Sequence, residues 1–409
     1  MQYHTRSLTA ILLFMVFIAS CKKDDNFSHY DIIAASTSYE DVQAAVDSAE
    51  NGDRVFIPAG TSTWLSTLEI PDDRRIALIG SGPDETIISS SENIPGMVIN
   101  MMNSGSRVTN MGFVLSNDNG VCIRVGGDRW RIDHCHFDNT IDQTIEGVMV
   151  WGTNNNGKCP TGVIDHCEFN NIRVVVVGDA RLMAHTVWAE PLGLGTDNAA
   201  FIEDCIYNFT QFGNCIDANY GGRYVFRYNI VNDAYIEAHS VQGNNRATRS
   251  WEVYGNTISQ VERSMWTPFF LRGGTGVVYD NTLLGDWTSA TITIDNRRSF
   301  EDLGDGGLAD GTSPWDGNEE ENGYPARDQI GRSTDQWLWT DENPYPPQEL
   351  DPFYQWENIY NGTNIDVYVH NNCGIHIKEN RDYYNNVEKP GYTPYVYPHP
   401  LIAEWDSWN

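Results

Sequence analysis

The sequence predicts an all-β fold, a single right-handed parallel β-helix, and a repeated segment is the main reason. Six stretches share one pattern, with an apolar residue three positions before a Cys or Asn and another two positions after it. The shared positions are Cys135, Cys167, Cys205, Asn229, Asn256 and Asn281. They are 32, 38, 24, 27 and 25 residues apart. Periods of this length are typical of stacked coils that bury one another's apolar faces.

The local pattern inside each repeat indicates strands. Apolar and polar residues alternate over short runs, and Gly, Asn and Asp interrupt them, which favours strands and turns over helices. An Asn tolerates left-handed backbone at a bend and can hydrogen-bond its equivalent in the next coil, about 4.8 Å away. In the first half of the chain Cys takes this position, and a small buried thiol fills an inward slot. We therefore expect a ladder of buried side chains along one bend.

The first residues resemble a bacterial lipoprotein signal. Residues 1–20 hold an apolar run of 11 residues, Leu8–Ile18, which is too short to span a membrane and typical of a signal peptide. Ile18–Cys21 resembles a lipobox, which implies cleavage before Cys21 and lipidation of that residue. Lys22–Asp25 resembles the tag of surface lipoproteins. The expected location is the cell outer membrane, with the protein lipid-anchored and surface-exposed.

Composition restricts the partners. The chain has 26 basic and 56 acidic residues, a net charge of −30, and such a surface repels nucleic acid. Seven cysteines remain besides Cys21, without a Cys-x-x-Cys or His-x-x-x-His pair, so we expect packed thiols and no metal site of the zinc type. We expect one repeat domain and a monomer, with no nucleic acid partner.

A helix is expected to precede the first strand. Residues 21–37 are assigned as a tether, and Ser38–Asp41 resembles a capping box with Asp in place of Glu. Apolar residues then recur on one helical face up to Ala49, and Gly52 is expected to stop the helix.

At this point the chain resembles a known family. A capping helix, then GDRVFIPAGT at 52–61, then IALIGSGPDETII at 76–88, is similar to the opening of pectate-lyase-like β-helix proteins. With the repeats, the resemblance covers residues 38–298. It implies the fold, and it leaves function open because the superfamily includes lyases, hydrolases and binders. Pectate lyases of this superfamily often use Ca²⁺ held by clustered Asp, which makes Ca²⁺ an alternative cofactor here.

The remainder divides into two parts. Residues 299–364 form an acidic insert rich in Gly, Pro and Trp, and residues 365–409 form a final coil and a C-terminal cover. The insert tryptophans are Trp315, Trp337, Trp339 and Trp356, for which we favour packing over sugar stacking. The insert also holds Asp302, Asp305, Asp310 and Asp316. These acids alternate with glycines but lack EF-hand spacing, so they support Ca²⁺ only weakly.

An arginine-rich segment suggests an acidic ligand. Residues 223–298 hold eight arginines, no lysine and seven acids, in a chain that is otherwise strongly acidic. Arg forms forked bonds to carboxylate and sulfate, so this segment predicts binding of an acidic polysaccharide. The expected substrate-binding residues are Arg227, Arg246, Arg272 and Glu237. The alternative is that these arginines pair with neighbouring acids along the coils.

Residues 234–240 carry the candidate chemistry. If Ile236 and Ala238 point inward, Tyr235, Glu237 and His239 share the outer face. β-Elimination on a uronate needs a group that neutralises the carboxylate, a base for the C5 proton and an acid for the leaving oxygen. Arg223 and Arg249 are expected to neutralise the carboxylate, His239 to act as the base, and Tyr235 or a nearby Arg to act as the acid.

Two other functions stay open. Asp217, Glu237 and Asp295 are outward candidates on successive coils, and paired carboxylates would instead make a glycoside hydrolase. A non-catalytic glycan-binding or structural lipoprotein would show the same repeats. The leading expectation is a surface polysaccharide lyase.

Overall fold

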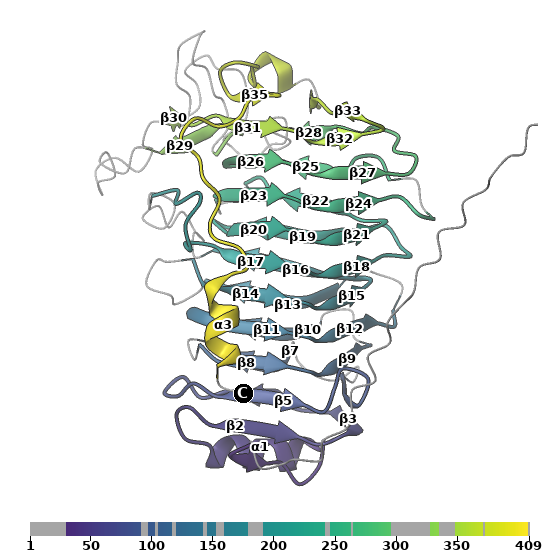
Figure 1. Ribbon diagram of the computed structural model, residues 1–409, viewed down its shortest axis with the longest axis vertical. Coiled ribbons are helices and arrows are strands. Elements are labelled where there is room, and N and C mark those ends of the chain that lie inside the picture. The colour runs from purple at the N-terminus through teal and green to yellow at the C-terminus, as the bar shows by residue number, and fades with distance from the viewer. Residues whose placement is uncertain are drawn as a thin grey trace, which may run out of the picture.

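The computed structural model describes residues 30–90, 97–102, 105–116, 120–141, 145–152, 159–178, 191–241, 246–262, 265–295, 328–334, 348–370 and 373–407. These residues form a right-handed parallel β-helix, which confirms the fold predicted from the repeats. Each coil adds one strand to each of three long sheets, of 12, 11 and 10 strands, here named A, B and C (Figure 1). The signal segment and Cys21 lie outside the described residues, as do the four insert aspartates and Trp315, Trp337 and Trp339.

Sheet A contains β1 (Ile32–Ile33), β2 (Arg54–Ile57), β5 (Ala77–Gly80), β8 (Arg107–Thr109), β11 (Asp128–Asp133), β14 (Thr161–Asp165), β17 (Ala200–Glu203), β20 (Arg223–Arg227), β23 (Ser250–Tyr254), β26 (Thr275–Tyr279), β31 (Phe353–Trp356) and β35 (Tyr383–Asn385). Sheet B contains β3 (Gly60–Trp64), β6 (Thr86–Ser90), β9 (Gly112–Leu115), β12 (His136–Asn139), β15 (Glu168–Asn170), β18 (Ile206–Asn208), β21 (Ile230–Asn232), β24 (Thr257–Ser259), β27 (Thr282–Leu284), β32 (Ile359–Tyr360) and β33 (Thr363–Asn364).

Sheet C contains β4 (Leu68–Glu69), β7 (Met97–Met101), β10 (Val121–Val125), β13 (Ile145–Trp151), β16 (Ile172–Val177), β19 (Asn214–Asn219), β22 (Tyr235–Ala238), β25 (Phe269–Leu271), β28 (Ile292–Ile294) and β34 (Val367–Val369). Neighbouring strands in the three sheets run parallel, except at the β32–β33 edge. A small antiparallel pair, β29 (Arg332–Thr334) and β30 (Gln348–Leu350), lies outside them, and a 3-10 helix spans Cys373–Ile375.

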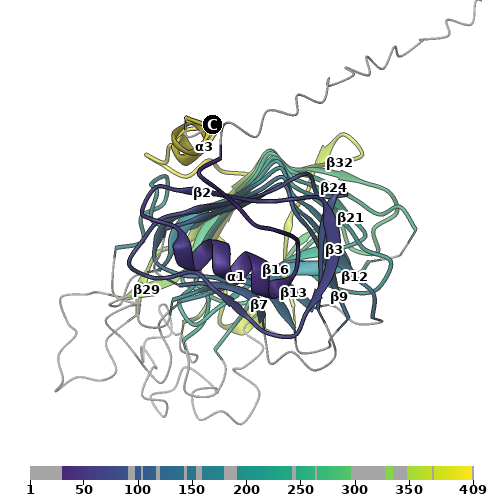
Figure 2. The same cartoon turned by 90° about the horizontal axis from the view of Figure 1, so that it is seen from below.

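The expected capping helix is α1 (Tyr39–Ser48), which lies across the N-terminal end of the coils (Figure 2). Ser38 accepts a hydrogen bond from the Asp41 backbone N–H at 3.3 Å, which is one half of the capping box. The other half is missing, because the Asp41 carboxylate accepts from Ser36 Oγ instead of the Ser38 N–H. The helix ends at Ser48, before Gly52, and Gly52 turns the chain toward β2 with φ +102°. Among the described residues, no helix is long and apolar enough to cross a membrane.

The interior is filled by ladders of like side chains. Phe113, Phe137, Phe169 and Tyr207 stack on successive coils, with ring centroids 5.2, 4.8 and 4.7 Å apart. Seven cysteines of the described residues are buried thiols that form no disulfide, as the sequence predicted: Cys122, Cys135, Cys159, Cys167, Cys205, Cys215 and Cys373. Regular apolar stacking of this kind keeps strand register fixed and sets which side chains face out.

The Asn ladder runs along the bend between sheets A and B. The Asn256 carbonyl oxygen accepts from the Asn229 backbone N–H at 2.9 Å, and Asn281 does the same for Asn256 at 3.1 Å. Asn358 continues the ladder by accepting from the Asn281 N–H at 3.2 Å, so coils resume inside the stretch assigned as an insert.

The left-handed residue of each bend is the one before the ladder residue. At the seven bends with a Cys or Asn ladder residue, from His134 to Glu357, its φ lies between +51° and +68°. The sequence prediction assigned this role to Asn itself. The Asn side chain instead points inward, where it hydrogen-bonds the next coil.

The residues after β35, 386–407, are here called the C-terminal segment. This segment runs along the outside of sheet A and does not cover the end of the β-helix (Figure 1). It ends in α3 (Pro400–Asp406), which packs on β11 and β14. Buried arginines of sheet A hold this segment. Arg131 bonds Asp165 at 2.8 Å and Asp406 at 2.6 Å, and Arg227 donates to the Tyr395 carbonyl at 2.8 Å. The final residues are therefore part of the side wall.

Candidate functional site

The candidate site lies on the outer face of sheet C, at β19, β22 and β25. Ile236 and Ala238 belong to the core, so Tyr235, Glu237 and His239 face outward, as the alternation predicted. Ile216 is in register with Ile236, which places Asp217 beside Glu237 on the neighbouring coil. Arg272 follows Leu271, the register partner of Ala238, and so lies beside His239.

Glu237 is the centre of the hydrogen-bond network. Its Oε1 accepts from Arg272, and its Oε2 accepts from Asn214 Nδ2 at 2.6 Å. The same Arg272 nitrogen donates to His239 Nδ1 at 2.9 Å. That imidazole nitrogen lies 3.5 Å from Asp217 Oδ2 and 3.6 Å from Glu237 Oε1.

A second layer of contacts fixes these groups. Arg173 donates to Asn214 Oδ1 at 3.1 Å and to Glu146 Oε1 at 2.7 Å, and so orients the amide that binds Glu237. The Arg272 guanidinium lies over the Phe270 ring, 4.7 Å from its centroid. Planar contacts of this kind hold a guanidinium in one orientation.

The two carboxylates of the site differ in proton affinity. Burial and the neighbouring charge of Asp217 raise the pKa of Glu237 above its ordinary value, although Arg272 acts in the opposite sense. For Asp217, burial acts to raise the pKa, but the contact with His239 and the charges of Arg173 and Arg272 outweigh it and lower that pKa. Burial also raises the pKa of Tyr235, so this phenol keeps its proton. Two adjacent acids with opposite shifts suit a proton donor and an anion.

Asp217 Oδ1 is buried and has no hydrogen-bond partner among the described residues. One atom each of Asp217, Glu237 and His239 lies within 4.8 Å of the others, a spacing that could hold a metal. However, Arg272 already contacts Glu237 and His239 between these groups. Ca²⁺ prefers six to eight oxygen ligands, so two carboxylates and an imidazole are a poor set for it. The Arg272 guanidinium therefore supplies positive charge at the position where a metal would lie.

Two of the predicted arginines lie on sheet A, away from His239. Arg227 is fully buried, pairs with Glu203 and donates to the carbonyls of the C-terminal segment. Arg223 is 2% exposed and donates to the Leu192 carbonyl at 3.1 Å. The sequence prediction grouped them with His239 because they are near in sequence, but β20 and β22 belong to different sheets.

Two more predicted arginines lie in the connection between β22 and β23. Arg246 is fully buried against Asp328, with its Nε 2.8 Å from Oδ2. Arg249 is 2% exposed and donates to Ser333 Oγ at 2.9 Å. Burial, together with the nearby Arg223 charge, lowers the pKa of Arg249 to about 9. Of the five arginines named as ligand-binding or catalytic, all within the described residues, only Arg272 joins His239 and Glu237, so these five do not share one basic surface.

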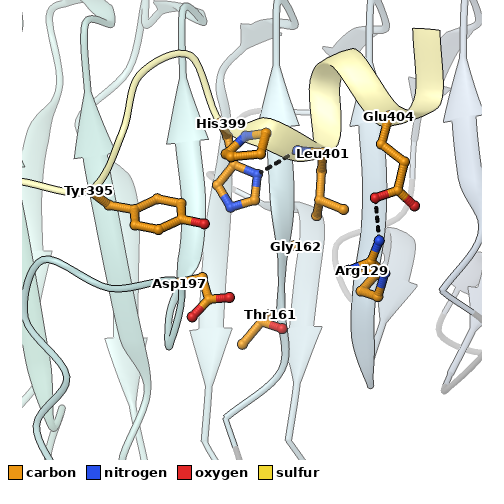
Figure 3. A pocket seen from close by; sticks show the side chains of 9 residues that line it. Arg129, Thr161, Gly162, Asp197, Tyr395, His399, Leu401 and Glu404 are labelled. Carbon is orange, nitrogen blue, oxygen red and sulfur yellow. Dashed lines mark hydrogen bonds and ion pairs between the residues drawn. The ribbon is translucent and has the colours of Figure 1, made fainter. Parts of the chain in front are cut away.

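A small cavity lies on sheet A, away from this site. It lies between the C-terminal segment and sheet A, has a volume of about 100 Å³ and is shown in Figure 3. It is lined by Arg129, Thr161, Gly162, Asp197, Tyr395, His399, Pro400, Leu401 and Glu404.

Three long parallel sheets, one strand per coil in each, with a capping helix and an inward Asn ladder, define the fold type. The chain is a right-handed parallel β-helix. No family model matches this β-helix, and no curated protein matches it.

Several solved structures resemble this β-helix at low identity. One is the catalytic unit of a GH87 alpha-1,3-glucanase from Streptomyces thermodiastaticus, with 14% identity, a TM-score of 0.40, and coverage of 63% of this chain and 55% of that chain. Another is an alginate lyase from Paenibacillus sp., with 14% identity, a TM-score of 0.35, and coverage of 64% and 93%. Carrot pectin methylesterase has 13% identity, a TM-score of 0.38, and coverage of 84% and 90%. The likeness concerns the fold.

Sequence reasoning missed Asn214 and Arg173, which orient the site. Asn214 begins β19, and Arg173 is the one polar residue of the otherwise apolar β16. For Arg173, that exception to the apolar run was the available signal.

Proposed function

We propose that this β-helix hydrolyses a polysaccharide, with Asp217 and Glu237 as its two working carboxylates. The observation that carries the proposal is their pairing on adjacent coils with pKa values shifted in opposite directions. Environments that separate the pKa values of two neighbouring acids assign them different roles. Glu237 is the proton donor to the leaving oxygen, and Asp217 is the ionised partner that faces the sugar.

The spacing of the two acids favours retention of configuration. Their closest ligand oxygens lie within 4.8 Å of each other. Retaining glycosidases have carboxyl groups about 5–5.5 Å apart, whereas inverting ones need about 6.5–9.5 Å to admit a water between them. In this proposal the ionised Asp217 carboxylate attacks the anomeric carbon as Glu237 protonates the leaving oxygen, and water then hydrolyses the glycosyl-enzyme. Arg272 stabilises the carboxylate that Glu237 becomes after it gives up its proton.

β-Elimination on an acidic polysaccharide is the second candidate, and His239 is the observation that favours it. Its side chain is 20% exposed, against 7% for Asp217 and 7% for Glu237. That exposure suits a base, and Tyr235, which keeps its proton, suits an acid. Of the described arginines predicted for this site, Arg272 is the one beside His239, so the uronate carboxylate would depend mainly on it. Hydrolysis ranks first for that reason.

One experiment separates these functions. Purified protein is incubated with a panel of neutral and uronate-containing polysaccharides, and new reducing ends and ultraviolet-absorbing unsaturated ends are both measured. Hydrolysis gives reducing ends alone, and Glu237→Gln abolishes them. Elimination gives unsaturated ends, and His239→Ala abolishes those. Glu252→Gln is the matched control, because Glu252 is also buried but lies on sheet A. Binding without either product leaves the non-catalytic alternative and overturns the proposal.

We also propose that the protein is a surface lipoprotein of the outer membrane. The support is the sequence Ile18–Cys21 followed by Lys22–Asp25. Cys21→Ala should move the protein from the membrane fraction to the soluble fraction, or leave it unprocessed. Unchanged fractionation and unchanged gel mobility would overturn this assignment.

A further inference from the structure

We propose that the outer surface of the β-helix binds a divalent transition-metal ion such as Zn²⁺ between His134 and His166. The two histidines lie at the bend between sheets A and B, whereas the acids lie on sheet C, so metal binding does not depend on the proposed glycan cleavage. The sequence predicted no zinc-type site because ligand pairs a few residues apart are missing. The stacking of coils instead brings together two histidines 32 residues apart.

The two imidazoles are stacked on adjacent coils. His134 follows the last residue of β11 and His166 the last residue of β14, and each precedes a ladder cysteine. Their ring centroids lie 5.1 Å apart, and the ring planes differ by 3°. Both side chains are 50% exposed. The fold therefore presents two imidazoles side by side to the solvent, and imidazole is a ligand that Zn²⁺, Cu²⁺ and Ni²⁺ favour.

A buried aspartate orients each imidazole. His134 Nδ1 lies 2.8 Å from Asp133 Oδ2, and His166 Nδ1 lies 2.9 Å from Asp165 Oδ2. Both carboxylates are fully buried, and each accepts two bonds from an arginine of sheet A. A carboxylate held in this way accepts a hydrogen bond from the imidazole, so Nδ1 carries the proton and Nε2 offers its lone pair. Metal-binding histidines commonly have such a carboxylate behind the ring, which fixes the ring and makes the other nitrogen a stronger ligand.

One ion can bind both rings after a small movement. Because the aspartate contact is the same in the two rings, their Nε2 atoms are separated by about one strand spacing, ~4.8 Å. Zinc–nitrogen bonds are about 2.0–2.1 Å long, so one ion spans at most about 4.2 Å between two nitrogens. The Nε2 atoms must therefore approach each other by about 1–2 Å, which half-exposed side chains achieve by torsional changes of less than about 30° that keep them near their rotamers. Water takes the remaining coordination positions.

The surroundings of the pair favour a cation. Asp204 occupies the equivalent bend position on the coil after His166, with φ +56° against +52°. The hydrogen bond with Asp165 and the charges of Asp165 and Asp204 raise the pKa of His166, although burial and Arg131 act in the opposite sense. A negative potential that favours a proton on this imidazole also attracts a metal ion. The net charge of −30 on the chain adds to this attraction.

Titration calorimetry with ZnCl₂ tests the site on the full chain, purified without a histidine tag and stripped of metal by a chelator. We expect Zn²⁺ to bind, and His134→Asn and His166→Asn each to weaken binding at least about tenfold. Asn suits both positions, because Asn110 holds the equivalent place on the coil before His134 with φ +57°. His136→Asn is the matched control, since His136 is also partly exposed and lies 3.2 Å from Asp84, but its side chain belongs to sheet B.

Thermal unfolding gives a second measurement. Saturating Zn²⁺ should raise the unfolding midpoint of the wild type and of His136→Asn, and should leave that of the His134→Asn, His166→Asn double variant unchanged. Zinc binding that survives in both single variants, or no zinc binding by the wild type, overturns the proposal. Binding that is lost in Glu237→Gln but kept in His134→Asn places the ion on sheet C and also overturns it.

Discussion

Asp217 and Glu237 lie next to each other on adjacent coils, and their surroundings shift their pKa values in opposite directions. Both are almost fully buried, so burial alone would raise both pKa values. His239, Arg173 and Arg272 act to lower both pKa values. The difference comes from two contacts that the acids do not share: a hydrogen bond with His239 lowers the pKa of Asp217, and the charge of Asp217 raises that of Glu237.

This difference predicts a bell-shaped pH profile of kcat/KM. Activity requires ionised Asp217 and protonated Glu237, so it should fall as the pH drops through the lowered pKa of Asp217. It should also fall as the pH rises through the pKa of Glu237, which lies above its ordinary value of 4.5. Arg272→Gln removes a charge that favours ionised Glu237, so the alkaline limb should move to higher pH. The profile of an Arg129→Gln control should not move, and an unmoved alkaline limb in Arg272→Gln would contradict the role of Glu237.

Arg227 should contribute strongly to stability. It is fully buried, pairs with Glu203 and donates to the carbonyls of Tyr395 and Val396. Arg227→Met strands a buried carboxylate, which costs about 3–5 kcal/mol. Urea unfolding measures the change. Arg129, with a side chain 56% exposed and an ion pair to Glu404, is the control, and its loss should cost about 1 kcal/mol or less. Equal effects of the two substitutions would show that burial of the pair does not matter.

Asn256 should be the critical residue of the Asn ladder. Its side chain accepts from Asn229 and donates to the Phe226 and Tyr254 carbonyls. Asn256→Ala leaves buried polar groups without partners, at about 1–3 kcal/mol. Asn232→Ala is the control, since the Asn232 side chain donates a similar hydrogen bond to the Asn208 side chain on the partly exposed face of sheet B. Chemical denaturation should show the larger loss for Asn256→Ala, and the reverse order would contradict this account.

His399 should make stability fall as the solution becomes acidic. Burial and the charges of Arg227 and Arg129 lower its pKa from 6.5 to about 4. Below pH 6.5 the unfolded chain therefore binds a proton that the native state does not, and stability is lost progressively down to about pH 4. At pH 5 the loss is about 2 kcal/mol.

The matched variant is His399→Asn. His399 Nδ1 caps α3 by accepting from the Leu401 N–H at 3.2 Å, and Asn can supply the same cap without titrating. Unfolding midpoints at pH 7 and pH 5 should therefore differ less in this variant than in the wild type. An equal difference would assign the acid sensitivity to other groups.

The sequence predicted the fold well because the fold is local and repeated. Each coil has a ladder residue that can be recognised in the sequence, from Cys135 to Asn281. The alternation of inward and outward residues at 234–240 places Glu237 and His239 on the same face. The arginines were grouped incorrectly for a physical reason. Neighbours in sequence such as Arg227 and Tyr235 belong to different sheets, and the segment that covers Arg227 lies more than 160 residues further along the chain. Asn358 was missed because the preceding long stretch interrupts the period.

The C-terminal segment changes how this β-helix can be assembled. Solenoids gain stability coil by coil, because each repeat touches only its neighbours. Here Arg107 and Arg131, from early coils, contact Asp406 near the end of the chain. Arg107 and Arg131 cannot complete these contacts until Asp406 has been synthesised. The early coils therefore acquire their full set of bonds late in folding. Folding that joins early and late residues in this way is more cooperative than the addition of one coil after another from one end.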